Sequence, residues 1–118
     1  MGTPTGLHKI DGKIGDGLPT DTVFRARKPV GRLGEMPEDE LSKNLITSRI
    51  LRLRGLEDGV NSGGDVDTYS RYVYIHGTNQ EDKIGSPNSH GCVLLRCCDA
   101  KRLFDIARDG DIVLISAQ

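Results

Sequence analysis

The sequence predicts a single, mainly-β domain with one short helix. Fifteen of the 118 residues are glycine. This share is well above the average of roughly 7% in soluble proteins and indicates many turns. The apolar segments are short and contain Val, Ile and Tyr, which favour strands. Only one segment repeats apolar residues at the helical spacing, and a chain of this length is typical of one domain.

Short strands are expected between the glycine and proline breaks of the first half. Two extended segments fit at residues 6–10 and 22–27, and the acidic stretch 37–40 is expected to be an exposed loop. Residues 44–56 mix apolar and basic side chains in partial alternation, which predicts a half-buried strand. The glycines and acidic residues of 57–67 predict another loop.

The second half contains the strongest strand signal. Residues 71–76 include Tyr72, Val73, Tyr74 and Ile75, all of which are good sheet formers. Residues 77–89 are polar and predict a loop, and residues 91–95 fit either a short buried strand or the approach to a helix.

The helix is expected at residues 99–108, followed by a final strand at residues 111–116. Asp99 is a plausible N-cap, and Gly110 follows as a C-terminal stop. The preceding Cys97 and Cys98 are expected at the start of this helix, with one side chain facing the core. The apolar face of the helix consists of Ala100, Leu103, Phe104 and Ala107.

The composition excludes several classes of function. The net charge is −1, from 16 basic and 17 acidic residues, so the chain lacks the basic surface that nucleic-acid binding requires. It has no Trp and five other aromatic residues, too few for a base-stacking platform. No apolar run approaches the roughly 20 residues that cross a bilayer. We therefore expect no nucleic-acid partner and no membrane span.

The residues best suited to catalysis are Cys92 and two histidines. The three cysteines, at positions 92, 97 and 98, are too crowded to form a disulfide framework. A thiol becomes a nucleophile as its thiolate, and a nearby imidazole can take the proton. His90 is two residues from Cys92, and His76 follows a predicted strand. Either histidine is therefore a candidate base, and a backbone carbonyl or a carboxylate could orient it.

Two other interpretations of these residues stay open. Cys92 could be an ordinary buried apolar residue. The cysteines and histidines are also zinc-ligand types, although no Cys-x2-Cys or His-x3-His pair is present. The gathering of two histidines around one Gly-Cys pair favours catalysis over both.

The motifs resemble those of a known enzyme family. Tyr74-Ile75-His76-Gly77-Thr78-Asn79, followed after the polar loop by Ser89-His90-Gly91-Cys92, resembles the signature of the L,D-transpeptidases of bacterial cell-wall synthesis, the YkuD-like catalytic domain. Thr3-Pro4-Thr5-Gly6 looks like the family's stretch before a strand. Ile84-Gly85, residues 99–104 and the final strand fit in the same order. The resemblance covers essentially the whole chain.

The resemblance implies the fold and the roles of the site residues. The expected fold is a mainly-β sandwich with one short helix after the nucleophile, and residues 1–118 would form a single catalytic domain that is N-terminally incomplete. Cys92 would be the nucleophile and His76 the general base. The Gly77 carbonyl would orient His76, and backbone amides near Gly91 would hold the oxyanion. The residues expected to bind substrate are Ser89, His90, Asn79 and Arg96.

The implied reaction is acyl transfer in peptidoglycan cross-linking, which serves cell-wall biogenesis and cell shape. The thiolate would attack the peptide bond after an L-centre, commonly diaminopimelate, of a stem tetrapeptide and expel a D-amino acid. An amine would then take the acyl group from the thioester. The alternatives are an L,D-carboxypeptidase, in which water is the acceptor, and a weakly active or non-catalytic peptidoglycan-binding relative. No metal or organic cofactor is required, and carbapenem β-lactams are expected inhibitors.

The sequence departs from the family pattern at two positions near the nucleophile. Leu94 stands where the family usually has Arg, and Cys97 stands where it usually has Asn. Arg can hold a carboxylate through a bidentate fork and Leu cannot, so Arg96 is expected to substitute in part. We also expect an activated Cys92 to react with thiol reagents well below pH 8.

The resemblance to the family also implies how the protein would assemble and where it would be located. The family's further N-terminal strands would cover a sheet edge that this chain leaves open, so we expect homo-association through that edge. The substrate implies a location in the periplasm or on the cell-wall side, although the sequence shows no export signal.

Overall fold

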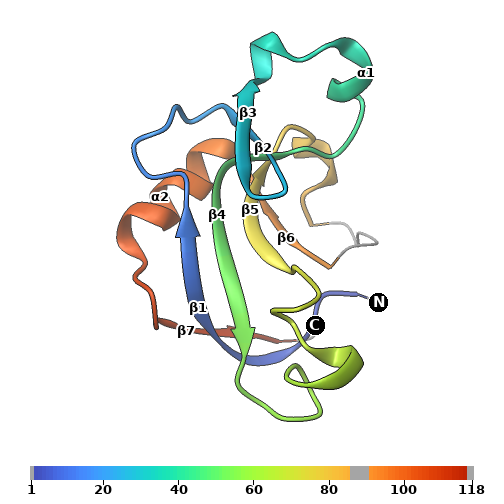
Figure 1. Cartoon of the computed structure of the whole chain (residues 1–118), viewed down its shortest axis with the longest axis vertical. Coiled ribbons are helices and arrows are strands. Elements are labelled where there is room, and N and C mark those ends of the chain that lie inside the picture. The colour runs from blue at the N-terminus through green and yellow to red at the C-terminus, as the bar shows by residue number, and fades with distance from the viewer. Residues whose placement is uncertain (1, 86–90, 117–118) are drawn as a thin grey trace.

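The computed structural model describes residues 2–85 and 91–116, and this part of the chain contains seven strands and two α-helices (Figure 1). The helices are α1 (Glu38–Leu41) and α2 (Cys97–Ile106). The strands are β1 (Gly6–Ile14), β2 (Thr22–Arg25), β3 (Lys28–Arg32), β4 (Ile46–Gly55), β5 (Tyr74–Thr78), β6 (Val93–Leu95) and β7 (Ile112–Ile115).

The long strand β4 organises the sheet. Along one edge it pairs antiparallel with β1 and, nearer its start, with β2. Along the other edge it pairs antiparallel with β5, which in turn pairs with β6 in parallel. β7 extends the arm that begins with β1, and β3 extends the arm that begins with β2. Hydrogen bonds thus join all seven strands into one sheet that branches at β4.

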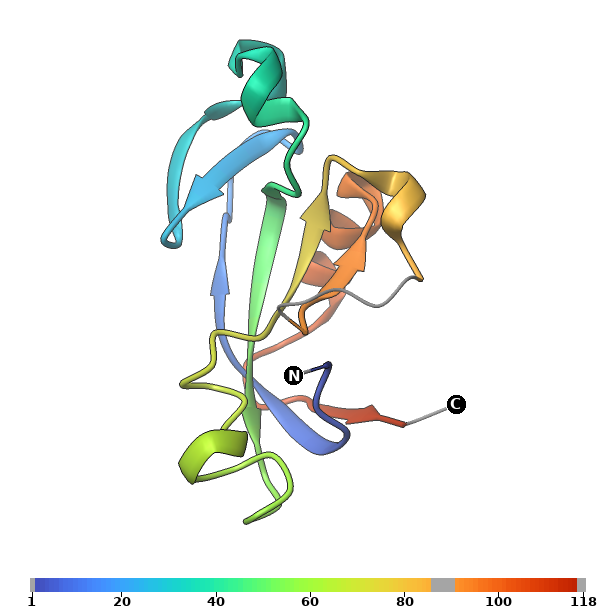
Figure 2. The same cartoon turned by 90° about the vertical axis from the view of Figure 1, so that its right-hand side faces the viewer.

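The two faces of this sheet bury separate apolar clusters. The first cluster lies under α2 and includes Leu51, Ile75 and Phe104. The second lies on the other face and includes Phe24 of the β2–β3 hairpin together with Tyr74. Figure 2 shows the hairpin and α2 on opposite sides of β4 and β5. Because side chains alternate along β5, this strand supplies residues to both clusters and is fully buried.

The structure confirms the mainly-β class and the helix after Cys92, and it differs from the sequence predictions in detail. β1 runs four residues beyond the expected segment, to Ile14, with a register shift between Ile10 and Lys13. The strand β3 was not predicted, since its side chains are mostly exposed and leave no apolar pattern. The acidic segment 37–40, expected as a loop, contains most of the helical turn α1. In the described residues, no helix is both long and apolar enough to span a membrane.

The helix α2 begins earlier than the predicted N-cap. It starts at Cys97 with Arg96 as its N-cap residue, so Asp99 lies within the first turn. There the Asp99 carboxylate accepts a hydrogen bond from Nε of Arg96 at 2.8 Å and lies at the positive end of the helix. Gly110 forms the turn before β7 rather than the cap of the helix, which ends at Ile106.

Candidate active site

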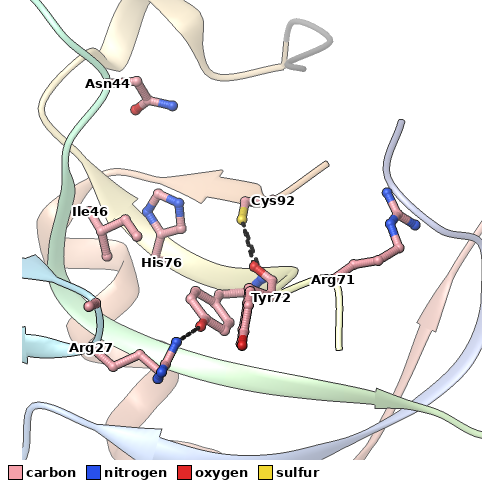
Figure 3. Close-up of a pocket in the computed structure, with 9 residues that line it drawn as sticks. Arg27, Asn44, Ile46, Arg71, Tyr72, His76 and Cys92 are labelled. Atoms are coloured by element: carbon pink, nitrogen blue, oxygen red, sulfur yellow. Dashed lines mark hydrogen bonds between the residues drawn. The ribbon is translucent and has the colours of Figure 1, made fainter. Parts of the chain in front are cut away.

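A pocket of about 450 Å³ lies on the face of the sheet that the β2–β3 hairpin covers (Figure 3). Its lining residues come from four places: the turn between β2 and β3, the start of β4 with the segment before it, β5 with the turn before it, and the residue before β6. They are Ala26, Arg27, Asn44, Ile46, Arg71, Tyr72, Tyr74, His76 and Cys92.

The strand register brings Cys92 and His76 to the same face of the sheet. In the parallel pair of β5 and β6, His76 lies opposite Leu94. Cys92 is two residues before Leu94, and residues two apart on an extended chain project to the same side. Both side chains line the same pocket, as Figure 3 shows. Two segments that are distant in the sequence therefore converge on one site.

His76 is held in one orientation by its neighbour. The side chain is 3% exposed, and its Nδ1 lies 2.6 Å from the carbonyl oxygen of Gly77. A carbonyl only accepts hydrogen bonds, so Nδ1 carries the proton and Nε2 keeps its lone pair in the neutral ring. Burial lowers the pKa of His76, and the Gly77 hydrogen bond opposes that shift only in part. The imidazole is therefore neutral at pH 7.

Cys92 is buried in the wall of the same pocket, in a largely apolar setting. It is 9% exposed and packs in the second core cluster with Tyr74 and Leu94. Its Sγ donates to the carbonyl oxygen of Tyr72 at 3.6 Å and accepts from the backbone N–H of Tyr74 at 3.4 Å. Burial raises the pKa of the Cys92 thiol, while the Tyr74 N–H and the positive charge of Arg71 partly offset this. The direction is opposite to the expected activation well below pH 8, because the thiol lies away from water.

The backbone before Cys92 requires a glycine. Gly91 is buried and has a φ of +81°, a conformation that side chains other than glycine rarely adopt. A Cβ atom at this position would lie 2.9 Å from the backbone oxygen of Gly2. The N-terminal segment therefore passes directly over Gly91.

The structure brings some of the predicted site residues together and places others elsewhere. Cys92, His76, Gly77 and Gly91 meet at the pocket or directly beside it. Ser89 and His90 lie outside the described residues.

Asn79 and Arg96, predicted to bind substrate, are not among the pocket residues. Asn79 holds the segment before β4: its Oδ1 accepts from the N–H of Leu45 at 2.8 Å, and its Nδ2 donates to the carbonyls of Leu41 and Lys43. This segment carries Asn44 into the pocket wall. Arg96 forms an exposed ion pair with Asp99 at the start of α2.

Leu94, at the position where the resembled family usually has Arg, is a core residue in this chain. It is 8% exposed and packs in the second cluster, so the site has no cation at this position. The positive charges in the pocket come instead from two arginines elsewhere in the chain, Arg27 and Arg71.

Sequence reasoning missed most of the pocket wall. The alternation along the predicted strand could have found Tyr74, because it is two residues before His76 and so shares its face. Arg27 and Asn44 reach the pocket from a turn and from the segment before β4, and no local pattern marks them. For the zinc interpretation, no group of three or more His, Cys, Asp or Glu side chains in residues 2–85 and 91–116 could hold a metal ion.

Comparison with known proteins identifies the family of the chain. Comparisons with curated proteins and with solved structures gave no significant match. The family model of the L,D-transpeptidase catalytic domain, YkuD, matches residues 1–115. The match spans nearly the whole chain, including β5, the segment before β6 and the final strand. The chain therefore belongs to the YkuD family of L,D-transpeptidase catalytic domains.

Proposed function

We propose that this protein is a cysteine-dependent L,D-transpeptidase of peptidoglycan, with Cys92 as the nucleophile and His76 as the general base. The observation that carries the proposal is the shared pocket, lined by the oriented, neutral imidazole of His76 on β5 and by the buried thiol of Cys92 directly before β6. Family membership supports the same reaction class.

The ionisation states favour proton transfer during the reaction over a pre-formed ion pair. The pKa of the thiol is raised and the pKa of the imidazole is lowered, so both groups are neutral at pH 7. The Cys92 thiol donates to the Tyr72 carbonyl at rest, so its proton would have to leave this partner and pass to Nε2 of His76 during the reaction. His76 would then take this proton as the sulfur attacks the donor carbonyl.

The same two residues would carry out the remaining steps of the catalytic cycle. The sulfur forms a thioester with the acyl group of the stem peptide, and the leaving D-amino acid takes the proton from His76. The acceptor amine then attacks the thioester and gives a proton to His76, and His76 passes this proton to the departing sulfur, which restores the thiol of Cys92. Gly77 would keep the imidazole oriented through its carbonyl, and backbone amides near Gly91 would hold the oxyanion. Such a substrate belongs on the periplasmic or cell-wall side of the membrane.

Product analysis with a defined donor tests this proposal. The protein is incubated with a disaccharide-tetrapeptide and an amine acceptor, and the products are identified by mass spectrometry. We expect release of the terminal D-amino acid and a new amide to the acceptor, and we expect neither with Cys92→Ala. A tripeptide without the new amide would instead identify an L,D-carboxypeptidase. Turnover that persists in Cys92→Ala would contradict the proposed nucleophile.

A further inference from the structure

The pocket lined by Cys92 carries positive charge. Among the described residues that line it are two guanidinium groups, those of Arg27 and Arg71, and no Asp or Glu. Across residues 2–85 and 91–116, six ion pairs join other basic side chains to carboxylates, and neither Arg27 nor Arg71 takes part in one. The chain as a whole has a net charge of −1, so this positive site is local.

Arg27 lies in a backbone turn whose conformation is strained. Ala26 and Arg27 form the turn between β2 and β3, with φ values of +50° and +66° that are unfavourable for side-chain-bearing residues. Nη1 of Arg27 donates to the hydroxyl of Tyr74 at 2.9 Å, and the guanidinium lies 4.9 Å from the centre of the Tyr72 ring. These contacts fix the group while leaving further N–H donors that no described residue accepts.

Arg71 is held on the other side of Tyr72 (Figure 3). Its Nη2 donates to the carbonyl of Gly2 at 3.1 Å and lies 3.4 Å from the position that a Cβ atom of Gly91 would occupy. This places the guanidinium next to the segment that carries the nucleophile. The following residue, Tyr72, has a φ of +57°. Of the four described non-glycine residues with positive φ, three line this pocket: Ala26, Arg27 and Tyr72.

We propose that the pocket binds an acyl donor through two carboxylates, one held by Arg27 and the other by Arg71. The inference rests on the proposed function, because it concerns the donor of that reaction. Guanidinium groups suit carboxylates through paired N–H donors, and a carboxylate that leaves water needs such a partner. The carboxylates adjacent to the bond that breaks would be the second carboxyl group of diaminopimelate and the terminal carboxyl group of the leaving D-amino acid. Arg27 and Arg71 would then supply the charge that Leu94 lacks.

Donor binding to the Cys92→Ala variant tests this inference without turnover. Calorimetry measures the Kd of a disaccharide-tetrapeptide and of two derivatives in which one or the other carboxylate is amidated. We expect Arg27→Met and Arg71→Met each to raise the Kd of the free diacid about 10- to 100-fold. Each variant should also be insensitive to amidation of one of the two carboxylates, a different one for each arginine, which a general loss of structure would not produce.

Arg25→Met serves as the matched control. Arg25 ends β2 near the same turn, but it is 65% exposed, pairs with Glu40 and does not line the pocket, so its loss should leave the Kd unchanged. The inference is overturned if both amidated donors bind as well as the diacid, or if Arg27→Met and Arg71→Met behave like Arg25→Met. Carboxylate-dependent binding without turnover by the parent protein would overturn the proposed function and uphold the two-carboxylate site.

Discussion

The ionisation of Cys92 and His76 determines the conditions under which the proposed reaction can run. Burial lowers the pKa of His76 below the 6.5 of an ordinary imidazole and raises the pKa of the Cys92 thiol. The base is therefore competent, that is unprotonated, down to pH values below 6.5. At the upper end, deprotonation of the thiol comes later than in an exposed cysteine.

This ordering predicts the pH dependence of acylation. The rate of donor acylation should rise with pH on an acidic limb whose apparent pKa lies below 6.5, and it should stay level through neutral pH. The profile is measured as kcat/KM between pH 4.5 and 8.5, which reports the free enzyme. An acidic limb centred above 6.5 would contradict the neutral pair, because it would require an imidazole stabilised in its charged form.

At the scale of elements, the start of α2 is fastened to the sheet by side chains of β4. The Ser48 hydroxyl donates to the carbonyl of Cys97 at 2.8 Å, and Sγ of Cys97 lies 3.1 Å from Oγ1 of Thr47. Ser48 has a φ of +70° and lies in a register shift between Thr47 and Ile50. The irregularity in β4 therefore directs these polar groups towards the helix that follows Cys92 and β6.

Substitution of Cys97 tests this attachment. Cys97→Ala should lower the free energy of unfolding by about 1 kcal/mol, because the hydroxyl of Thr47 loses a partner in a partly buried place. Cys97→Ser retains a polar group and should lose less. Urea denaturation of both variants gives the comparison, with the exposed Cys98→Ala as the control. Equal stability of all three variants would show that the contact contributes nothing.

The elements also show why some features could be predicted and others not. Residues 71–76 pointed to the strand that carries His76, and the helical spacing pointed to α2, because both depend on local patterns. The motifs around His76 and Cys92 pointed to two residues that line the same pocket. By contrast, β3 has mostly exposed side chains, and Arg27 reaches the site from a turn, so only the folded chain brings them to their positions. The burial that changes the pKa of Cys92 is likewise a property of the packed structure.

At the scale of the whole molecule, one outer face of β1 and β7 carries exposed apolar side chains around Lys9. Leu114 is 66% exposed and pairs across the strands with Leu7, and Ile112 is 63% exposed on the same face. β7 pairs only with β1 among the described strands, so its other edge is open. The expected homo-association through an uncovered edge stays a prediction, and these strands are the surface that would carry it.

Hydrodynamic measurements test this association. Sedimentation velocity over a range of concentrations should show a dimer that weakens in Leu114→Lys, because a charge on the outer face opposes burial. Val30→Lys is the control, since Val30 is also exposed but lies on β3, away from this surface. A monomer at every concentration would contradict the prediction.

The most direct test of the central claim is the rate at which a carbapenem acylates Cys92. In a Cys97→Ser, Cys98→Ser background, Cys92 is the sole cysteine, and intact-mass spectrometry follows the formation of the adduct. We expect one adduct per chain, none with Cys92→Ala, and a rate at least about 100-fold lower with His76→Gln, since general-base assistance typically contributes that much. An adduct that forms on Cys92→Ala, or an unchanged rate with a folded His76→Gln protein, would contradict the thiol–imidazole pair.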